Sequence, residues 1–180
     1  MKLNLDKIDK KNISFVGLMG SGKSLIGKLL SKKLEFEFID TDNKIEEIEK
    51  KTISEIFKKK GEKYFRNIEE IISLRFLKLN NKVIALGGGG YINPNIRKFT
   101  LKKCVSIWLD WKHETIINRI KSSKKRPLAV KLNNLELQKL IVKRSILYNL
   151  SDYKINCDKL DKKQIVEKII NFYENSQNTN

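Results

Sequence analysis

The chain has 180 residues, enough for one domain with a single buried core. It carries 38 Lys and Arg against 21 Asp and Glu, for a formal net charge of +17. Only six of the cations are Arg, and the lysines are scattered beside abundant Asn and Ile, whereas a nucleic-acid groove usually clusters its cations and uses Arg. We therefore expect a generically basic, soluble surface and no nucleic-acid partner.

Cysteine usage and targeting signals narrow the class of protein further. Cys104 and Cys157 lie far apart without CxxC spacing, which predicts neither a disulfide framework nor a zinc site. No apolar run reaches the roughly 18 residues of a membrane span, and residues 1–6 lack the apolar core of a secretory signal. The single histidine, His113, excludes chemistry built on several histidines. We expect a cytoplasmic protein without membrane contact.

Hydrophobic periodicity predicts strands that alternate with helices along the chain. The predicted strands cover residues 13–16, 36–39, 83–86, 105–109 and, more weakly, 153–155. The predicted helices cover residues 23–34, 45–57, 61–79, a short stretch from Pro94, 112–121, 135–150 and 165–172. This alternation indicates a parallel sheet covered by helices on both faces.

The remaining segments predict one domain over residues 1–180. Residues 122–134 are polar and basic without a core period, and we interpret them as a loop that acts as a lid. Residues 175–180 are predicted to be a frayed tail. The sequence has no internal repeat and no linker that would divide it.

Residues 17–24, Gly-Leu-Met-Gly-Ser-Gly-Lys-Ser, match the phosphate-binding pattern G-x-x-x-x-G-K-[ST]. Glycines let successive N–H groups point at phosphate oxygens, and the helix that follows adds its positive dipole end. Lys23 would neutralise the β- and γ-phosphates, and the Ser24 hydroxyl would bind Mg²⁺. Because the pattern lies between a predicted strand and a predicted helix, it predicts nucleotide binding.

Two acidic residues, Asp40 and Asp42, follow the second predicted strand. The carboxyl ends of parallel strands face the crevice in which ligands bind, so these acids are expected beside the phosphate loop. One of them would hold the metal shell and the other would accept a proton from an attacking hydroxyl. The alternative is that one of them only caps the next helix.

Because Lys is the usual cation of this chain, each Arg indicates a position that needs the planar guanidinium fork. We interpret four as candidates for binding carboxylate or phosphate, with a surface ion pair as the alternative for each: Arg66, Arg119, Arg126 and Arg144. Arg75 and Arg97 are interpreted as structural. The run of four glycines at 87–90 is better explained by close approach of a ligand to backbone N–H groups than by a tight turn.

In combination, these residues resemble the shikimate kinase family from about residue 13 to residue 172. The resemblance rests on an ordered set: the phosphate loop 17–24, Asp40-Thr41-Asp42, Gly61-Glu62 with Phe65-Arg66 and Glu69, Gly87-Gly88-Gly89, Arg126-Pro127-Leu128, and Arg144 with Leu147-Tyr148. The chain departs from the family at Leu25, where Thr is usual, and at Ile146, where Pro is common.

The resemblance implies an α/β P-loop NTPase fold of the nucleoside monophosphate kinase type. This is a three-layer sandwich around a five-stranded parallel sheet of order 2-3-1-4-5. It would carry a substrate-binding region at about residues 41–79 and a lid at about residues 122–134. The family phosphorylates the 3-hydroxyl of shikimate with ATP, in the pathway to chorismate and the aromatic amino acids.

The resemblance also implies roles for residues on the nucleotide side of the site. The ATP-binding set would comprise Gly20, Ser21, Gly22, Lys23, Ser24, Leu25, Arg119 and Arg126. Arg119 would lie against adenine, and Arg126 would meet the transferring phosphate when the lid closes. Ser24 and Asp40 would hold Mg²⁺, Asp40 through water.

On the acceptor side, the resemblance implies that Asp42 binds the shikimate hydroxyls and accepts the proton. Arg66 and Arg144 would clamp the shikimate carboxylate. Gly87, Gly88 and Gly89 would add backbone contacts, and Phe65 would form part of the pocket wall. The catalytic residues would then be Asp42, Lys23 and Arg126, in a monomeric enzyme.

Three alternatives remain open from the sequence. The chain could be another small-molecule P-loop kinase, of the gluconate or nucleoside monophosphate type. It could be a non-catalytic basic module that binds nucleic acid through the same fold. It could also be a paralogue that binds shikimate without phosphorylating it, although Lys23, Asp40 and Asp42 are all present.

Overall fold

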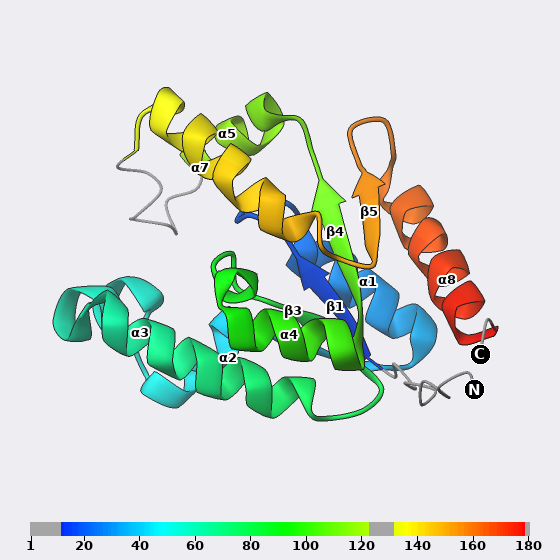
Figure 1. The fold of residues 1–180 in the computed structure, drawn as a ribbon, viewed down its shortest axis with the longest axis horizontal. Helices are drawn as coiled ribbons and strands as arrows, with labels where there is room; N and C mark the ends of the chain where they lie inside the picture. The colour runs from blue at the N-terminus through cyan, green and yellow to red at the C-terminus, as the bar shows by residue number, and fades with distance from the viewer. Residues whose placement is uncertain (1–11, 123–131, 179–180) are drawn as a thin grey trace, which may run out of the picture.

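A parallel sheet of five strands forms the centre of the molecule in the computed structural model, which describes residues 12–122 and 132–178 (Figure 1). The spatial order is β2-β3-β1-β4-β5, which confirms the predicted fold class and strand order. The strands are β1 (Asn12–Val16), β2 (Glu37–Asp40), β3 (Lys82–Ala85), β4 (Cys104–Asp110) and β5 (Tyr153–Asn156). All four strand pairings are parallel, so the carboxyl ends of the strands lie along one edge of the sheet.

Helices cover both faces of this sheet (Figure 1). The helical elements are α1 (Lys23–Leu34), α2 (Thr41–Glu49), α3 (Ile53–Leu77), η1 (Gly90–Ile92), α4 (Pro94–Lys103), α5 (His113–Lys121), α7 (Asn134–Tyr148) and α8 (Lys162–Asn178). Helices α1 and α8 pack on one face, and α3, α4, α5 and α7 contribute to the core on the other. Residues of one strand point alternately to the two faces of the sheet. In β1, Ile13 and Phe15 belong to the core beneath α1 and α8, and Val16 belongs to the core on the other face.

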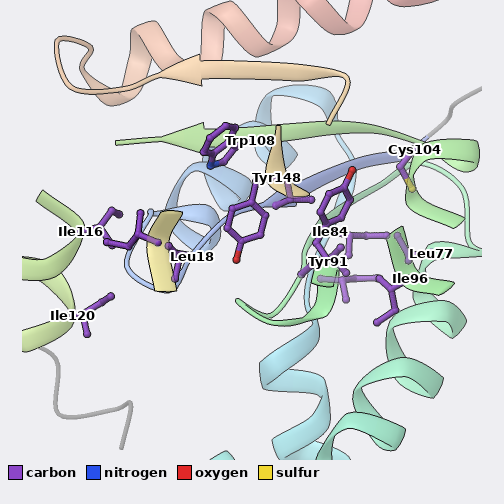
Figure 2. Close-up of a cluster of buried hydrophobic side chains, with 14 of the residues drawn as sticks. Leu18, Leu77, Ile84, Tyr91, Ile96, Cys104, Trp108, Ile116, Ile120 and Tyr148 are labelled. Atoms are coloured by element: carbon purple, nitrogen blue, oxygen red, sulfur yellow. The ribbon is translucent and has the colours of Figure 1, made fainter. Parts of the chain in front are cut away.

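The core beneath α4 and α7 contains large aromatic residues at its centre (Figure 2). Tyr148 lies between Trp108 and Tyr91, with ring-centroid distances of 6.0 and 6.4 Å. Tyr148 and Tyr91 are both buried, with side chains 1% exposed. This packing fixes the end of α7 relative to β4.

Element boundaries differ from the predictions where polar residues take part in regular structure. β2 and β3 begin at Glu37 and Lys82, which pair in register and form a 2.8 Å salt bridge between Glu37 Oε2 and Lys82 Nζ. The closing helix starts at Lys162 and extends to Asn178, so it is longer than predicted and includes part of the predicted tail. Asp161 and Gln164 exchange backbone-to-side-chain hydrogen bonds of 3.0 and 2.9 Å at its start, which satisfies its first N–H groups.

The predicted helical stretches 45–57 and 61–79 divide differently in the structure. α2 ends at Glu49, and α3 begins at Ile53 after a capping box formed by Thr52 and Glu55. Gly61 then kinks α3, with φ 80° and ψ 169°. The kink separates the first two turns of α3 from the segment that carries Arg66.

The described part of the chain includes no helix with the length and hydropathy needed to cross a bilayer. Cys104 and Cys157 are both buried and form no disulfide bond. Burial raises the pKa of the Cys157 thiol to about 12, so this sulfur is a poor nucleophile at neutral pH.

Asn12 provides a test of how the sheet is joined to α3. Its side-chain amide donates to the carbonyls of Leu77 and Leu79, and Lys82 N–H donates to Asn12 Oδ1 over 2.9 Å. Asn12→Ala leaves these buried groups without partners, so we expect the free energy of unfolding to fall by about 2–4 kcal/mol. Urea denaturation measures this change, and the exposed Asn95→Ala serves as control, with a loss below about 1 kcal/mol. Equal losses in both variants would contradict the bridging role.

Candidate active site

The phosphate loop connects β1 to α1 at the carboxyl edge of the sheet. Gly20 and Gly22 have φ angles of 79° and 90°, a region that residues with side chains rarely adopt, and Gly22 is the N-cap of α1. Lys23 Nζ donates to the carbonyls of Gly17 and Leu18, both at 2.8 Å, so the ammonium group is held inside the curve of the loop. The loop therefore combines a helix N-terminus with a buried cation, which suits a bound phosphate.

Asp40 has two functions in the structure. Its Oδ1 accepts from the N–H groups of Asp42 and Asn43 at 3.1 and 3.4 Å and so caps α2, while its Oδ2 accepts from Ser24 Oγ at 2.5 Å. The same carboxylate therefore caps α2, as the alternative from the sequence proposed, and contacts Ser24 directly. The cap fixes the carboxylate at the edge of the phosphate loop.

The chemistry of this pair fits a magnesium ion. Mg²⁺ prefers hard oxygen ligands and usually takes only one or two from the protein, together with water and substrate phosphates. Ser24 Oγ and Asp40 Oδ2 are two such oxygens beside the phosphate loop. Among the residues that the structure describes, no cluster of three or more His, Cys, Asp or Glu side chains could hold a metal ion.

The glycine run after β3 lies in contact with side chains from other elements. A Cβ on Gly87 would come within 2.2 Å of Asp42 Oδ1, and a Cβ on Gly89 within 2.4 Å of Arg66 Nη1. A Cβ on Gly88 would lie 3.1 Å from the backbone N of Met19 in the phosphate loop. None of the four glycines has a positive φ. Gly87, Gly88 and Gly89 therefore leave space for these neighbours, and the expected approach of a ligand to their backbone N–H groups stays a prediction.

A buried hydroxyl connects this glycine run to the second strand. Thr41 lies between the two acids, is fully buried, and its Oγ1 accepts from Gly87 N–H at 2.9 Å and donates to Ala85 O at 3.3 Å. Asp40 and Asp42 therefore start α2 at a fixed height relative to β3. As a result, Asp42 Oδ1 lies directly against Gly87.

Arg66 is held by two carboxylates on its own helix. Its Nη1 donates to Glu69 Oε2 at 2.7 Å, and its Nε and Nη2 donate to Glu62 Oε1 at 3.2 and 3.1 Å. Its guanidinium also lies over the Phe65 ring, 5.2 Å from the centroid. The ion-pair alternative from the sequence thus applies to Arg66, but one of its partners is buried and belongs to the site.

That partner, Glu69, is only 2% exposed. Burial raises the pKa of Glu69 above its ordinary value of 4.5, although Arg66 and Arg144 both act to lower it. While the Glu69 carboxyl remains ionised, it stabilises the positive charge of the Arg66 guanidinium. Glu69 therefore determines both the position and the electrostatic environment of Arg66.

Arg144 reaches the same glycine run from α7. Its Nη1 donates to Gly88 O at 3.2 Å, and Tyr148 Oη, one helical turn later, donates to the same carbonyl at 2.7 Å. Burial raises the pKa of Tyr148 to about 12, so its hydroxyl stays protonated and remains a donor at physiological pH. The structure thus places Asp42, Arg66 and Arg144 around Gly87–Gly89.

Arg119, on α5, contacts the phosphate loop. Its guanidinium carbon is 3.9 Å from the centroid of the Trp111 ring, and its Nη1 donates to Gly20 O at 3.3 Å. Both residues line a pocket of about 740 Å³, together with Gly20–Gly22, Leu25 and residues 160–163 at the start of α8. A pocket of this size beside the phosphate loop suits the base of a nucleotide.

The remaining three arginines, Arg126, Arg97 and Arg75, differ in their surroundings. Arg126 lies outside the described residues. Arg97 donates to the carbonyls of Tyr91 and Ile92, both at 3.0 Å, and supports η1, as expected for a structural residue. Arg75 is exposed on α3.

Sequence reasoning assigned no role to four residues that position the site: Thr41, Glu69, Trp111 and Tyr148. Thr41, Glu69 and Tyr148 lie within the sequence segments that carry the family resemblance, and this position was the signal that could have identified them. Their roles depend on partners far along the chain, such as Gly88 for Tyr148. Trp111 had no sequence signal.

The glycine run can be tested by adding one methyl group at two positions. Gly87→Ala forces Asp42 and Glu69 to move, so the free energy of unfolding should fall by about 1–3 kcal/mol. Gly90→Ala meets no atom closer than 3.7 Å and is the matched control, with a change below about 1 kcal/mol. Chemical denaturation of both variants measures the difference, and a Gly87→Ala protein as stable as the control would contradict the crowding at Gly87.

Comparison with known proteins agrees with this geometry. A family model described as shikimate kinase matches residues 19–174. Shikimate kinase from Persephonella marina is 44% identical over 161 residues, which cover 89% of this chain and 97% of the relative. Shikimate kinase from Sulfurihydrogenibium sp. is 39% identical, with 89% of this chain and 96% of the relative covered.

Solved structures give the same result. The structure of shikimate kinase from Acinetobacter baumannii in complex with shikimate superposes with a TM-score of 0.86 at 29% identity, covering 93% of this chain and 95% of that one. A gluconokinase from Sinorhizobium meliloti reaches a TM-score of 0.58 at 14% identity, which reflects the shared fold alone. On the family model and the curated relatives, this chain belongs to the shikimate kinase family.

Proposed function

We propose that this chain is a shikimate kinase that transfers the γ-phosphoryl group of ATP to the 3-hydroxyl of shikimate. The observation that carries the proposal is the convergence of one carboxylate and two guanidinium groups on a glycine run that itself contacts the phosphate loop. Asp42, Arg66 and Arg144 come from three different helices, and Gly88 lies against Met19. An acceptor bound there would lie next to the phosphates of a nucleotide.

The acceptor must present a carboxylate and a hydroxyl at opposite ends. Arg66 and Arg144 would bind the carboxylate of shikimate, since a planar guanidinium group matches carboxylate geometry. Asp42 would then receive the 3-hydroxyl and take its proton as the oxygen attacks phosphorus. A substrate fixed at both ends has one hydroxyl in line with the γ-phosphate, which is the main requirement of phosphoryl transfer.

The donor is ATP, bound by Gly20, Ser21, Gly22, Lys23, Ser24 and Leu25 of the phosphate loop and α1. Lys23 and the N-terminus of α1 would neutralise negative charge on the phosphates as the bond to the leaving oxygen loosens. Ser24 and Asp40 would hold Mg²⁺, which when bound supplies further charge neutralisation between the β- and γ-phosphates. Arg119 would lie against the base, and Arg126 would meet the transferring phosphate.

We propose further that the enzyme works as a monomer in the cytoplasm. Support for the compartment comes from Cys104 and Cys157, which are buried and unbridged and so suit a reducing environment. Each group assigned a role in the reaction belongs to this one chain.

The proposal is tested by measuring ADP release from ATP and Mg²⁺ with and without shikimate. Release should depend on shikimate, and gluconate or a nucleoside monophosphate should not replace it. Asp42→Asn should lower kcat by about 10²–10⁴-fold, because it removes the proton acceptor and leaves the nucleotide site intact. Shikimate-independent release, or faster turnover of another acceptor, would overturn the proposal.

Arg144 and Arg75 form a matched pair for testing carboxylate recognition. Arg144→Ala should raise the KM for shikimate by about 10–100-fold and change the KM for ATP much less, because Tyr148 still holds the Gly88 carbonyl. Arg75→Ala removes the same charge from an exposed position and should leave both constants unchanged. Steady-state kinetics measure the four values, and a fall in kcat at constant KM for shikimate would contradict the role of Arg144.

Glu69 predicts how substrate binding depends on pH. Its pKa is raised by burial, so as the pH falls toward 4.5 it becomes neutral earlier than an ordinary glutamate, and Arg66 loses its ionic partner. The KM for shikimate should therefore rise as the pH falls through this raised pKa. Glu69→Gln should show a KM about tenfold higher at neutral pH and lack this acid-side rise. An unchanged pH profile in the variant would exclude Glu69 as the titrating group.

A further inference from the structure

Trp111 occupies an unusual position between the sheet and the nucleotide pocket. It directly follows β4 and is only partly buried, and it packs against both hydrophobic cores of the molecule. Its indole Nε1 donates to Ser21 O at 2.8 Å, a carbonyl within the phosphate loop. The ring is thus fixed in orientation by the loop that it borders.

The guanidinium group of Arg119 lies over the face of this ring. The guanidinium carbon lies 3.9 Å from the ring centroid, well within the range of a cation–π contact, and Nη1 donates to Gly20 O at 3.3 Å. A long arginine side chain loses considerable rotamer entropy when it is fixed in one place. In this structure, the tryptophan ring and the loop carbonyl both hold it.

We propose that Trp111 is a positioning residue for nucleotide binding: it holds the Arg119 guanidinium plane against the pocket so that the base stacks on a pre-ordered surface. The proposal rests on the proposed function for the identity of the nucleotide. Trp111 acts through Arg119, while the hydrogen bond to Ser21 keeps the indole in the orientation that the stack requires. Because protein groups alone hold Arg119, this arrangement lowers the entropic cost of binding the base.

A purely structural role would have a different signature. Trp108 of β4 is an example of such a role: it is 6% exposed and packs on Tyr148 within the core (Figure 2). Trp111 instead lines the pocket and contacts polar groups of the phosphate loop. Its substitution should therefore weaken nucleotide binding beyond any loss of stability.

The test uses Trp111→Ala, Trp111→Phe and the control Tyr153→Ala. Tyr153 is an aromatic residue at the start of β5 that stacks on Phe172 with a centroid distance of 4.0 Å, and it does not line the pocket. The Kd for ADP, measured by calorimetric titration, and the KM for ATP should both rise about tenfold in Trp111→Ala. In Trp111→Phe, which keeps a ring, both should rise about threefold. The KM for shikimate of the two Trp111 variants should stay at the wild-type value. The ADP affinity of the control Tyr153→Ala should also stay at the wild-type value.

A double-mutant cycle with Arg119→Ala separates action through Arg119 from any direct effect. If Trp111 acts by holding Arg119, then Trp111→Ala adds no further loss of ADP affinity in the Arg119→Ala background. Additive losses, an unchanged ADP affinity in folded Trp111→Ala, or an equal rise in the KM for shikimate would each overturn the proposal.

Failure of this inference is distinguishable from failure of the proposed function. ADP titration requires no acceptor, so it reports on Trp111 whether or not shikimate is phosphorylated. A wild-type protein that binds ADP without shikimate-dependent turnover would refute the proposed function and leave the cycle interpretable.

Discussion

Everything in the acceptor half of the site depends on the absence of side chains at Gly87–Gly89. The carboxylate of Asp42, the guanidinium of Arg66 and the backbone of the phosphate loop all lie closer to this run than a Cβ would allow at normal contact distances. The run connects β3 to η1 at the carboxyl edge of the sheet, where elements from both ends of the chain meet. Removing three methyl-sized volumes therefore lets three helices and one loop share a single small region.

The polar groups around this run are oriented by partners that are themselves buried. Thr41 joins the Gly87 N–H to β3, Tyr148 holds the Gly88 carbonyl, and Glu69 holds Arg66. Buried hydrogen bonds of this kind are costly to break, because each lost partner leaves a desolvated polar group. The side chains proposed to contact substrate are thus fixed in advance, and little ordering remains to be done on binding.

The nucleotide half uses the same strategy with different groups. Lys23 bridges two carbonyls of its own loop, and Trp111 binds a third while it supports Arg119. The two halves meet where Gly88 touches Met19. The glycine run and the phosphate loop therefore lie against each other through backbone atoms.

The sequence by itself determined the α/β class and the family, because strand–helix periodicity and the ordered glycine, aspartate and arginine motifs are local or linear features. The strand order came only as an implication of the family resemblance. It also indicated Asp40 and Asp42 as site residues, since they follow a predicted strand, and Arg66 and Arg144, since each Arg is an unusual choice in a lysine-rich chain. Only the tertiary structure decided why the glycines are there, that Asp40 both caps α2 and reaches Ser24, and which residues hold the arginines. The physical reason is that many of these functions are contacts between residues distant in the sequence, such as Tyr148 and Gly88, which are 60 positions apart, and periodicity carries no information about such contacts.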